Sequence, residues 1–143
     1  MKKTAVLIYL AFLLVPAFNA CKNKADDPHP HDNNHHHHTP NKAELTIASP
    51  TDNTKYNHGD TININVVAVG ELTLHGWKIT IRNTDDNSVL YTKDTHEHAK
   101  TLNISEKWVN DVHHHSDLEL EVEVGLDHDG NNATKKVRFH CMP

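Results

Sequence analysis

The chain has 143 residues, with 14 Lys and Arg against 19 Asp and Glu, and a formal net charge of −5 when histidine is neutral. This length allows one domain with an extension. The acidic balance argues against nucleic acid as a partner, because nucleic-acid binding needs a basic face. Histidine is the unusual component, at 15 residues, and imidazole groups in such number suggest chemistry that depends on pH or on metal ions.

The first 20 residues have the pattern of a secretory signal peptide. Two lysines near the start precede an apolar stretch of 11 residues, Ala5 to Val15. This is signal-peptide length, and it is too short for a membrane span of about 20 residues. The sequence FNAC at residues 18–21 resembles the lipobox of bacterial lipoproteins, although its Phe-Asn pair is uncommon there. The resemblance implies cleavage after Ala20 and lipidation of Cys21.

Lipidation predicts a membrane partner and a location. We expect a lipid-anchored protein of the Gram-negative cell envelope, an outer membrane lipoprotein that faces the periplasm or the cell surface. Acylation of Cys21 leaves Cys141 as the only thiol, so no disulfide is expected within the chain. Cys141 is then either a buried small apolar residue, the interpretation that we favour, or a soft metal ligand.

Residues 21–42 contain no Val, Ile, Leu or aromatic residue. Such a segment cannot form a core, and we predict a disordered, His-rich tether. A coil of this length has a root-mean-square reach of about 26 Å. Its histidines are expected to capture metal ions loosely as an auxiliary set: His29, His31, His35, His36, His37 and His38.

The chain from Ala43 onward reads as strands. Seven runs rich in apolar or alternating residues are separated by turn residues, at intervals near those of a sandwich. No stretch has sustained helical periodicity, and residues 106–112 allow at most a turn or two of helix. We therefore predict an all-β, antiparallel sandwich over residues 43–143. The expected strands are 45–48, 61–69, 74–82, 89–92, 101–105, 118–126 and 133–141.

The last two strands predict a specific register. Turn-forming residues 127–132 separate them. One pairing matches apolar with apolar and acid with base, and a one-residue slip destroys both patterns. The expected pairs are Leu120 with Phe139, Val122 with Val137, Glu119 with His140, Glu121 with Arg138 and Glu123 with Lys136.

Two segments of the sequence also resemble those of a known fold. The segments ASPTDNTKYNHGDTININV (48–66) and LDHDGNNATKKVRF (126–139) resemble the two ends of bacterial immunoglobulin-like domains. As a whole, the chain resembles small His-rich bacterial lipoproteins of unknown function with such a domain. The resemblance implies an immunoglobulin-like sandwich. Trp77 shares a strand face with Ile79 and Ile81 and is the candidate for its core tryptophan, whereas the disulfide of antibody domains is missing.

The sequence does not support an enzyme. It contains no nucleophile elbow, phosphate loop or HExxH motif. Asp127-x-Asp129-Gly130-Asn131 has a misplaced glycine and no closing Glu for a calcium loop, so we interpret it as a turn. We therefore predict a binding protein without enzymatic activity.

Strand order places the histidines at the two ends of the sandwich. Successive antiparallel strands reverse direction, so their connections alternate between the end where the domain begins (the N-terminal end) and the opposite end (the C-terminal end). We predict ligands at the N-terminal end because three separate segments converge there: His75, His96, His98 and His128. The alternative set, at the C-terminal end, is His58, His113, His115, His140 and Cys141.

Clustered neutral imidazoles predict a divalent metal ion as ligand, with zinc, copper and nickel as the candidates. The spacing of the histidines does not choose among these ions. The first hypothesis is an envelope lipoprotein that buffers, scavenges or senses such an ion. The alternative is a structural or adhesive immunoglobulin-like module that binds a protein or glycan partner, with its histidines incidental.

Overall fold

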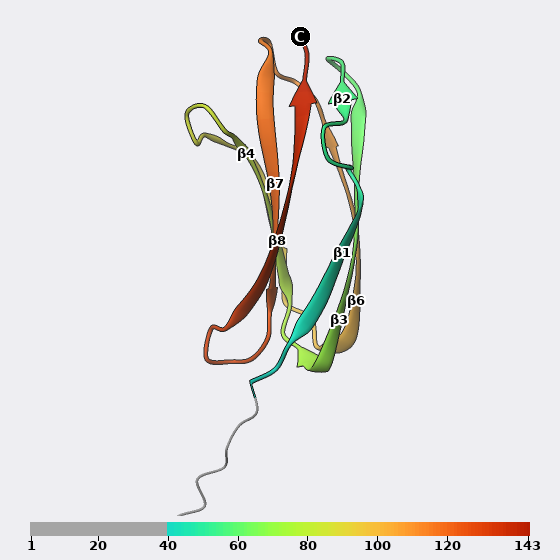
Figure 1. The fold of residues 1–143 in the computed structure, drawn as a ribbon, viewed down its shortest axis with the longest axis vertical. Helices are drawn as coiled ribbons and strands as arrows, with labels where there is room; N and C mark the ends of the chain where they lie inside the picture. Colours follow the sequence, from blue (N-terminus) through green and yellow to red (C-terminus); the bar gives the residue numbers. More distant parts are fainter. Residues whose placement is uncertain (1–39) are drawn as a thin grey trace, which may run out of the picture. The chain divides into compact units, whose positions relative to one another are not determined.

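The computed structural model describes residues 40–143. The predicted signal peptide, Cys21 and the six tether histidines lie outside the described residues. Within 40–143, no helix is long and apolar enough to cross a membrane. The described chain forms eight strands (Figure 1): β1 Ala43–Ser49, β2 Lys55–Tyr56, β3 Thr61–Leu74, β4 Trp77–Asn83, β5 Val89–Thr95, β6 Ala99–Val109, β7 Ser116–Gly125 and β8 Asn132–Cys141.

The strands form two facing sheets, as predicted. One has three strands in the order β1-β3-β6, and the other has five in the order β2-β8-β7-β4-β5. Every pairing is antiparallel except that of β2, a two-residue strand absent from the prediction, which runs parallel to the end of β8. Residues 106–112, which by sequence allow at most a turn or two of helix, form none, because β6 continues to Val109 and pairs there with Thr61 of β3.

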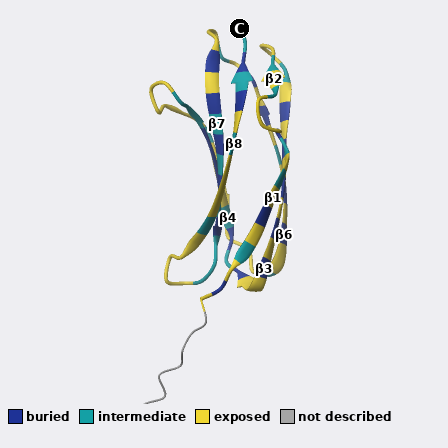
Figure 2. Cartoon of the chain, in the orientation of Figure 1, coloured by how far each residue is buried: buried dark blue, intermediate teal, exposed yellow. Residues whose placement is uncertain are grey.

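Strict alternation of buried and exposed residues builds the core between the sheets (Figure 2). Along β3, Ile62 and Ile64 are fully buried between exposed neighbours. On β7, Leu118 and Leu120 are fully buried between exposed or half-buried neighbours. Side chains of this size stabilise a fold by roughly 1.5–3 kcal/mol each when buried. Hydrophobic patterning with a period of two residues therefore accounts for the sandwich.

The core tryptophan differs from the prediction. Trp108 of β6 is 8% exposed and belongs to the core, whereas Trp77 is only half-buried and packs at its margin. Leu102 and Ile104 precede Trp108 on the inward face of β6. The alternation of β6 thus turns Trp108 inward, and Trp77 stands at the first position of β4, where the sheet meets its end connection.

The predicted β7–β8 register is wrong by two residues. Leu118 pairs with Phe139, and Leu120 with Val137. The loop spans 126–131 instead of 127–132, and the Leu126 amide closes it by donating to the Asn131 carbonyl at 2.8 Å. A two-residue shift preserves strand alternation, so each side chain keeps its predicted face and acid still meets base. The ion pairs on the outer face are Lys136–Glu119 at 2.9 Å, Lys136–Glu121 at 2.7 Å and Arg138–Glu119 at 3.1 Å.

Two lysines connect the sheets along their sides. Lys93 of β5 forms an ion pair with Glu106 of β6 at 2.7 Å. This contact joins the edge strand of one sheet to an edge strand of the other. Elsewhere, Lys135 of β8 donates to the carbonyl oxygen of Leu45 in β1 at 2.7 Å. Charged side chains thus cover the sides of the sandwich while the apolar core lies between them.

Candidate functional site

The structure brings the four histidines at the N-terminal end together. The ring centroid of His75 lies 4.1 Å from that of His128 and 4.8 Å from that of His98. The ring of His98 also lies 4.6 Å from that of His96 and 5.7 Å from that of His128. Three connections supply these rings, β3–β4, β5–β6 and β7–β8. We call these four residues the imidazole cluster; it lies at the lower end of the domain in Figure 1.

Close backbone packing holds two of the connections side by side. The amide of His75 donates to the Gly125 carbonyl at 2.8 Å, and the Gly125 amide donates to the Gly76 carbonyl at 3.0 Å. Gly76 has a φ of +112°, and a Cβ there would lie 2.5 Å from the Thr95 carbonyl oxygen and 3.1 Å from the Cα of His96. Only glycine permits both this conformation and this approach. Gly76 therefore lets His75 stand beside the segment that carries His96.

His128 lies in a turn that hydrogen bonds to Asp127 hold in place. The Asp127 carboxylate accepts hydrogen bonds from the Asp129 amide at 2.9 Å, the Asn131 amide at 3.1 Å and the Asn131 side chain at 2.6 Å. The bond from the Asn131 side chain is the main cause that holds the pKa of Asp127 below its usual value. The carboxylate thus holds the turn together, as the interpretation of this segment as a turn requires.

The side chain of Asn41 connects the start of the domain to the segments beside the imidazole cluster. This buried side chain donates to the carbonyls of Thr73 at 3.1 Å and Leu126 at 2.9 Å, and accepts from the Leu72 amide at 2.9 Å. By sequence, Asn41 belongs to the predicted tether, because a polar residue among polar residues gives no signal of burial. Asn41 is therefore packed into the domain although it precedes the predicted start, and it links the end of β3 to the β7–β8 connection.

His75 is the most constrained member of the cluster. Burial lowers the pKa of His75, and the neighbouring His128 and His98 rings lower it further. Within residues 40–143, its Nδ1 is the one buried side-chain nitrogen or oxygen without a hydrogen-bond partner. Leaving such a group unpaired costs roughly 1–3 kcal/mol. A ring that favours its neutral form and has an unused nitrogen suits metal ligation.

His96 and His98 form a direct pair. Their Nε2 atoms lie 2.9 Å apart, within hydrogen-bond distance. When both rings are neutral, one Nε2 carries the proton and the other accepts it, so the two rings hold different tautomers. Both side chains are exposed, and an incoming ion has direct access to them.

The cluster is grouped but is not a closed coordination shell. Within the described part of the chain, no three His, Cys, Asp or Glu side chains surround a common point as metal ligands do. Bringing a third imidazole onto an ion held by His96 and His98 requires rotation of a side chain. His128 is exposed and free to make that rotation, whereas His75 is partly buried.

The C-terminal end does not gather its predicted set. Its histidines form separate pairs, His58 with His113 at 5.5 Å and His115 with His140 at 5.7 Å between ring centroids. Cys141 is fully buried, and burial raises the pKa of its thiol to about 11. Cys141 is therefore a core residue, in agreement with the favoured interpretation.

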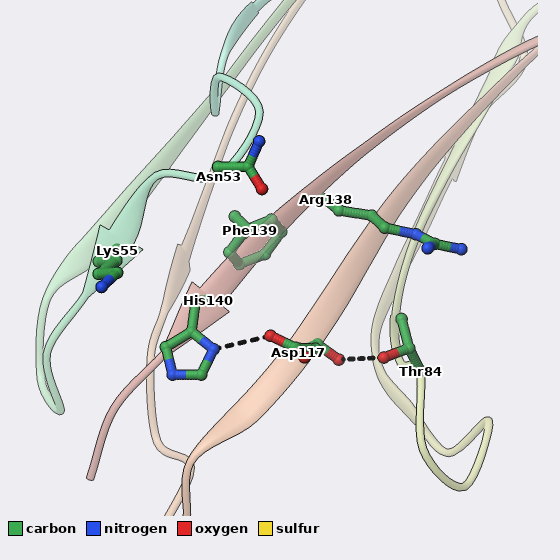
Figure 3. A pocket seen from close by; sticks show the side chains of 7 residues that line it. All are labelled: Asn53, Lys55, Thr84, Asp117, Arg138, Phe139 and His140. Atoms are coloured by element: carbon green, nitrogen blue, oxygen red, sulfur yellow. Dashed lines mark hydrogen bonds and ion pairs between the residues drawn. The ribbon is translucent and has the colours of Figure 1, made fainter.

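A cavity of about 410 Å³ lies near this end (Figure 3). Within it, His140 Nδ1 lies 2.7 Å from Asp117 Oδ1, and the Thr84 hydroxyl donates to the Asp117 carbonyl oxygen at 3.0 Å. In Figure 3, the Arg138 guanidinium points away from His140. The polar groups therefore do not converge on one point. The lining residues are Asn53, Lys55, Thr84, Asp117, Arg138, Phe139 and His140.

No protein-family model matches the chain, and no curated protein matches it. Among solved structures, it is similar to the fibronectin(III)-like modules of Clostridium thermocellum CbhA, with 18% identity, coverage of 69% of this chain and 96% of that one, and a TM-score of 0.46.

Two further solved structures are similar to the chain. The CARDB domain of a Pyrococcus furiosus protein, in complex with di-metal ions, has 11% identity, coverage of 71% and 96%, and a TM-score of 0.41. Murine CRIg has 13% identity, coverage of 69% and 97%, and a TM-score of 0.39. The described chain is an all-β sandwich of a three-stranded and a five-stranded sheet.

Proposed function

We propose that this domain binds a divalent transition-metal ion through the imidazole cluster, and that the protein buffers, scavenges or senses that ion in the cell envelope. The observation that carries the proposal is the convergence of four imidazoles from three connections, with neighbouring ring centroids 4.1–5.7 Å apart. Neutral imidazole is a good ligand for zinc, copper and nickel. Convergence from separate segments also means that metal binding stabilises the fold, because the unfolded chain has no such grouping.

The test is metal-induced thermal stabilisation of the chain expressed from residue 22. The tether histidines are replaced by asparagine, so that only folded histidines report. We expect the stabilisation to disappear when His96 and His98 are both replaced by alanine. The matched control replaces His113 and His115, which are also exposed and two positions apart. If the stabilisation survives the first change and disappears with the second, the ligands are at the C-terminal end instead.

The pH dependence supplies an independent test of the ligand type. A protonated imidazole cannot bind metal, so affinity should fall as the pH drops through roughly 6.5. Calorimetric titration at pH 7.5 and pH 5 measures this change. Affinity that stays the same over this interval would point to carboxylate ligands and contradict the imidazole cluster.

We further propose that lipid on Cys21 anchors the domain to a membrane of the envelope. The support is the sequence pattern of residues 1–21, which lies outside the described residues. Mass spectrometry of the protein from a membrane fraction should find Cys21 acylated at the N-terminus. The Cys21→Ala variant should leave that fraction.

A second candidate function rests on a different surface. The fold is also that of structural and adhesive modules, and Val67 and Val69 are exposed on the outer face of β3, at 39% and 45%. Their neighbours across the sheet include Asn103 and Thr101 of β6. On the other side they pair with Thr46 and Glu44 of β1. This polar face with two exposed valines suits a protein or glycan surface. Replacing both valines by lysine should then abolish partner binding, and the metal-site variants should leave it unchanged.

A further inference from the structure

We propose that His37 and His38, the histidines nearest to the start of the domain, supply ligands to the ion at the imidazole cluster. This inference rests on the proposed metal-binding function and deepens it, because two tether residues then belong to the tight site instead of capturing ions loosely. Both histidines lie outside the described residues. The support comes from Pro40 and Asn41, the first described residues, and from the groups around them.

The side chain of Asn41 fixes the point at which the chain enters the domain. It is buried, and it donates to the carbonyl oxygens of Thr73 at 3.1 Å and Leu126 at 2.9 Å. Thr73 and Leu126 each stand two residues before a member of the cluster, His75 and His128 respectively. The chain therefore enters the domain between the two segments that carry these rings.

A cavity of about 350 Å³ lies beside this entry point and extends to the cluster. Its lining includes Pro40, Asn41 and His75, together with Asp127 and Asp129. The volume is in the range of ligand pockets, and the two carboxylates favour a cation inside it. Pro40 thus shares a cavity with His75, the ring whose Nδ1 has no hydrogen-bond partner among the described residues.

The distance along the chain limits which tether histidines stay close to this cavity. Each residue spans at most about 3.6 Å, so the Cα atom of His38 lies within about 7 Å of that of Pro40, and the Cα atom of His37 within about 11 Å. His31 and His29 precede Pro40 by 9 and 11 residues and are restricted far less. A ligand on a short linker acts at an effective concentration in the millimolar range.

The cluster can use additional ligands. Its rings form neighbouring pairs, and no three His, Cys, Asp or Glu side chains of residues 40–143 surround a common point as metal ligands do. A zinc site in a protein has three or four protein ligands. An imidazole from the tether would complete such a set without rotation of every cluster ring onto one ion.

Insertion of a spacer tests the inference without removing any side chain. A Gly/Ser spacer of about 12 residues is inserted between Thr39 and Pro40 of the chain expressed from residue 22. The matched control has the same spacer between Lys24 and Ala25, upstream of every tether histidine. The two proteins have the same composition. The first insertion lengthens the link from His38 to Asn41 about fivefold, which lowers the effective concentration about 10-fold.

Competition with a chromogenic chelator measures the tightest Zn(II) site of each protein. We expect the spacer after Thr39 to weaken that site about 10-fold relative to the spacer after Lys24. The difference should disappear when His96 and His98 are both replaced by alanine, because the cluster then no longer holds the ion.

Two outcomes would overturn the inference. Equal Zn(II) affinity of the two spacer proteins would mean that the tether binds ions independently of the domain. A difference that persists after replacement of His96 and His98 would mean that the tether shares its ion with other groups. The proposed function fails by a separate result, which is the absence of metal-induced stabilisation when all six tether histidines are replaced by asparagine.

Discussion

A Cβ atom on Gly76 would lie only 2.5 Å from the carbonyl oxygen of Thr95, so the β3–β4 and β5–β6 connections meet backbone to backbone. This approach brings His75 beside the segment that carries His96. Because the imidazole cluster depends on it, the glycine supports the candidate site without contributing any side chain.

Gly76→Ala should therefore destabilise the domain strongly. The φ of +112° costs a residue with a side chain about 1–2 kcal/mol, and the collision with Thr95 adds about 1–3 kcal/mol. Gly59→Ala is the matched control, since Gly59 has a φ of +82° but a Cβ there would meet nothing within 4 Å. Urea unfolding should show a loss of about 3 kcal/mol for the first variant and about 1 kcal/mol for the second. Equal losses would mean that the two connections separate at little cost.

The lowered pKa of His75 predicts how stability depends on pH in metal-free protein. Unfolding restores an ordinary pKa near 6.5, so the unfolded state binds a proton that folded His75 resists. The contribution of this residue is fully present above pH 6.5 and is lost as the pH falls below it. His75→Gln should therefore lose less stability than the parent between pH 7.5 and pH 5.

Urea midpoints in the presence of a chelator measure this difference. His114→Gln serves as the comparison, because it removes an exposed histidine outside the cluster. The prediction fails if His75→Gln and the parent lose equal stability on acidification.

The β7–β8 register can be measured through its ion pairs. Glu119 bonds to both Arg138 and Lys136, and the bond from Lys136 is the main cause that lowers the pKa of Glu119. A double-mutant cycle with Glu119→Gln and Arg138→Gln should give a coupling of about 0.2–1 kcal/mol at low salt. The same cycle on Glu121 and Arg138, the pair expected from the sequence, should give a smaller coupling. The reverse order would restore the sequence-based register.

The sequence was sufficient for the sheet faces but not for the register. Alternation with a period of two residues identifies the inward positions of β7 and β8, and this pattern is unchanged when one strand slides by two. The choice between the two registers depends on loop closure. The bond from Leu126 to Asn131 makes that choice, and the turn composition of residues 126–132 leaves it open.

The end of the sandwich at which each histidine lies was predictable, because strand order alone assigns connections to ends. Which histidines meet was not, since those at the C-terminal end form only separate pairs. That argument needs only the number of crossings, and β2 does not disturb it. Three other features depend on tertiary packing. Asn41 is buried by contacts with distant carbonyls, Gly76 by a neighbouring connection, and Trp108 by a strand longer than its apolar pattern indicated. No local pattern in the sequence encodes these contacts.

Burial should make Cys141 unreactive in the folded domain. The thiol has no solvent exposure, and its pKa of about 11 leaves only about one molecule in a thousand as thiolate at pH 8. In the chain expressed from residue 22, Ellman's reagent should modify Cys141 slowly in native buffer and rapidly in guanidinium chloride. Rapid reaction in native buffer would show that the end of β8 opens readily.

The ion pair between Lys93 and Glu106 has a consequence for self-association. Edge strands carry unpaired amide and carbonyl groups, which recruit strands from other molecules and lead to aggregation. Lys93 and Glu106 lie on edge strands of the two sheets and are joined at 2.7 Å. A strand adding to either edge would have to desolvate or break this pair. This side of the sandwich, where β5 and β6 are the edge strands, is thereby protected against edge-to-edge polymerisation, even where many copies are crowded together.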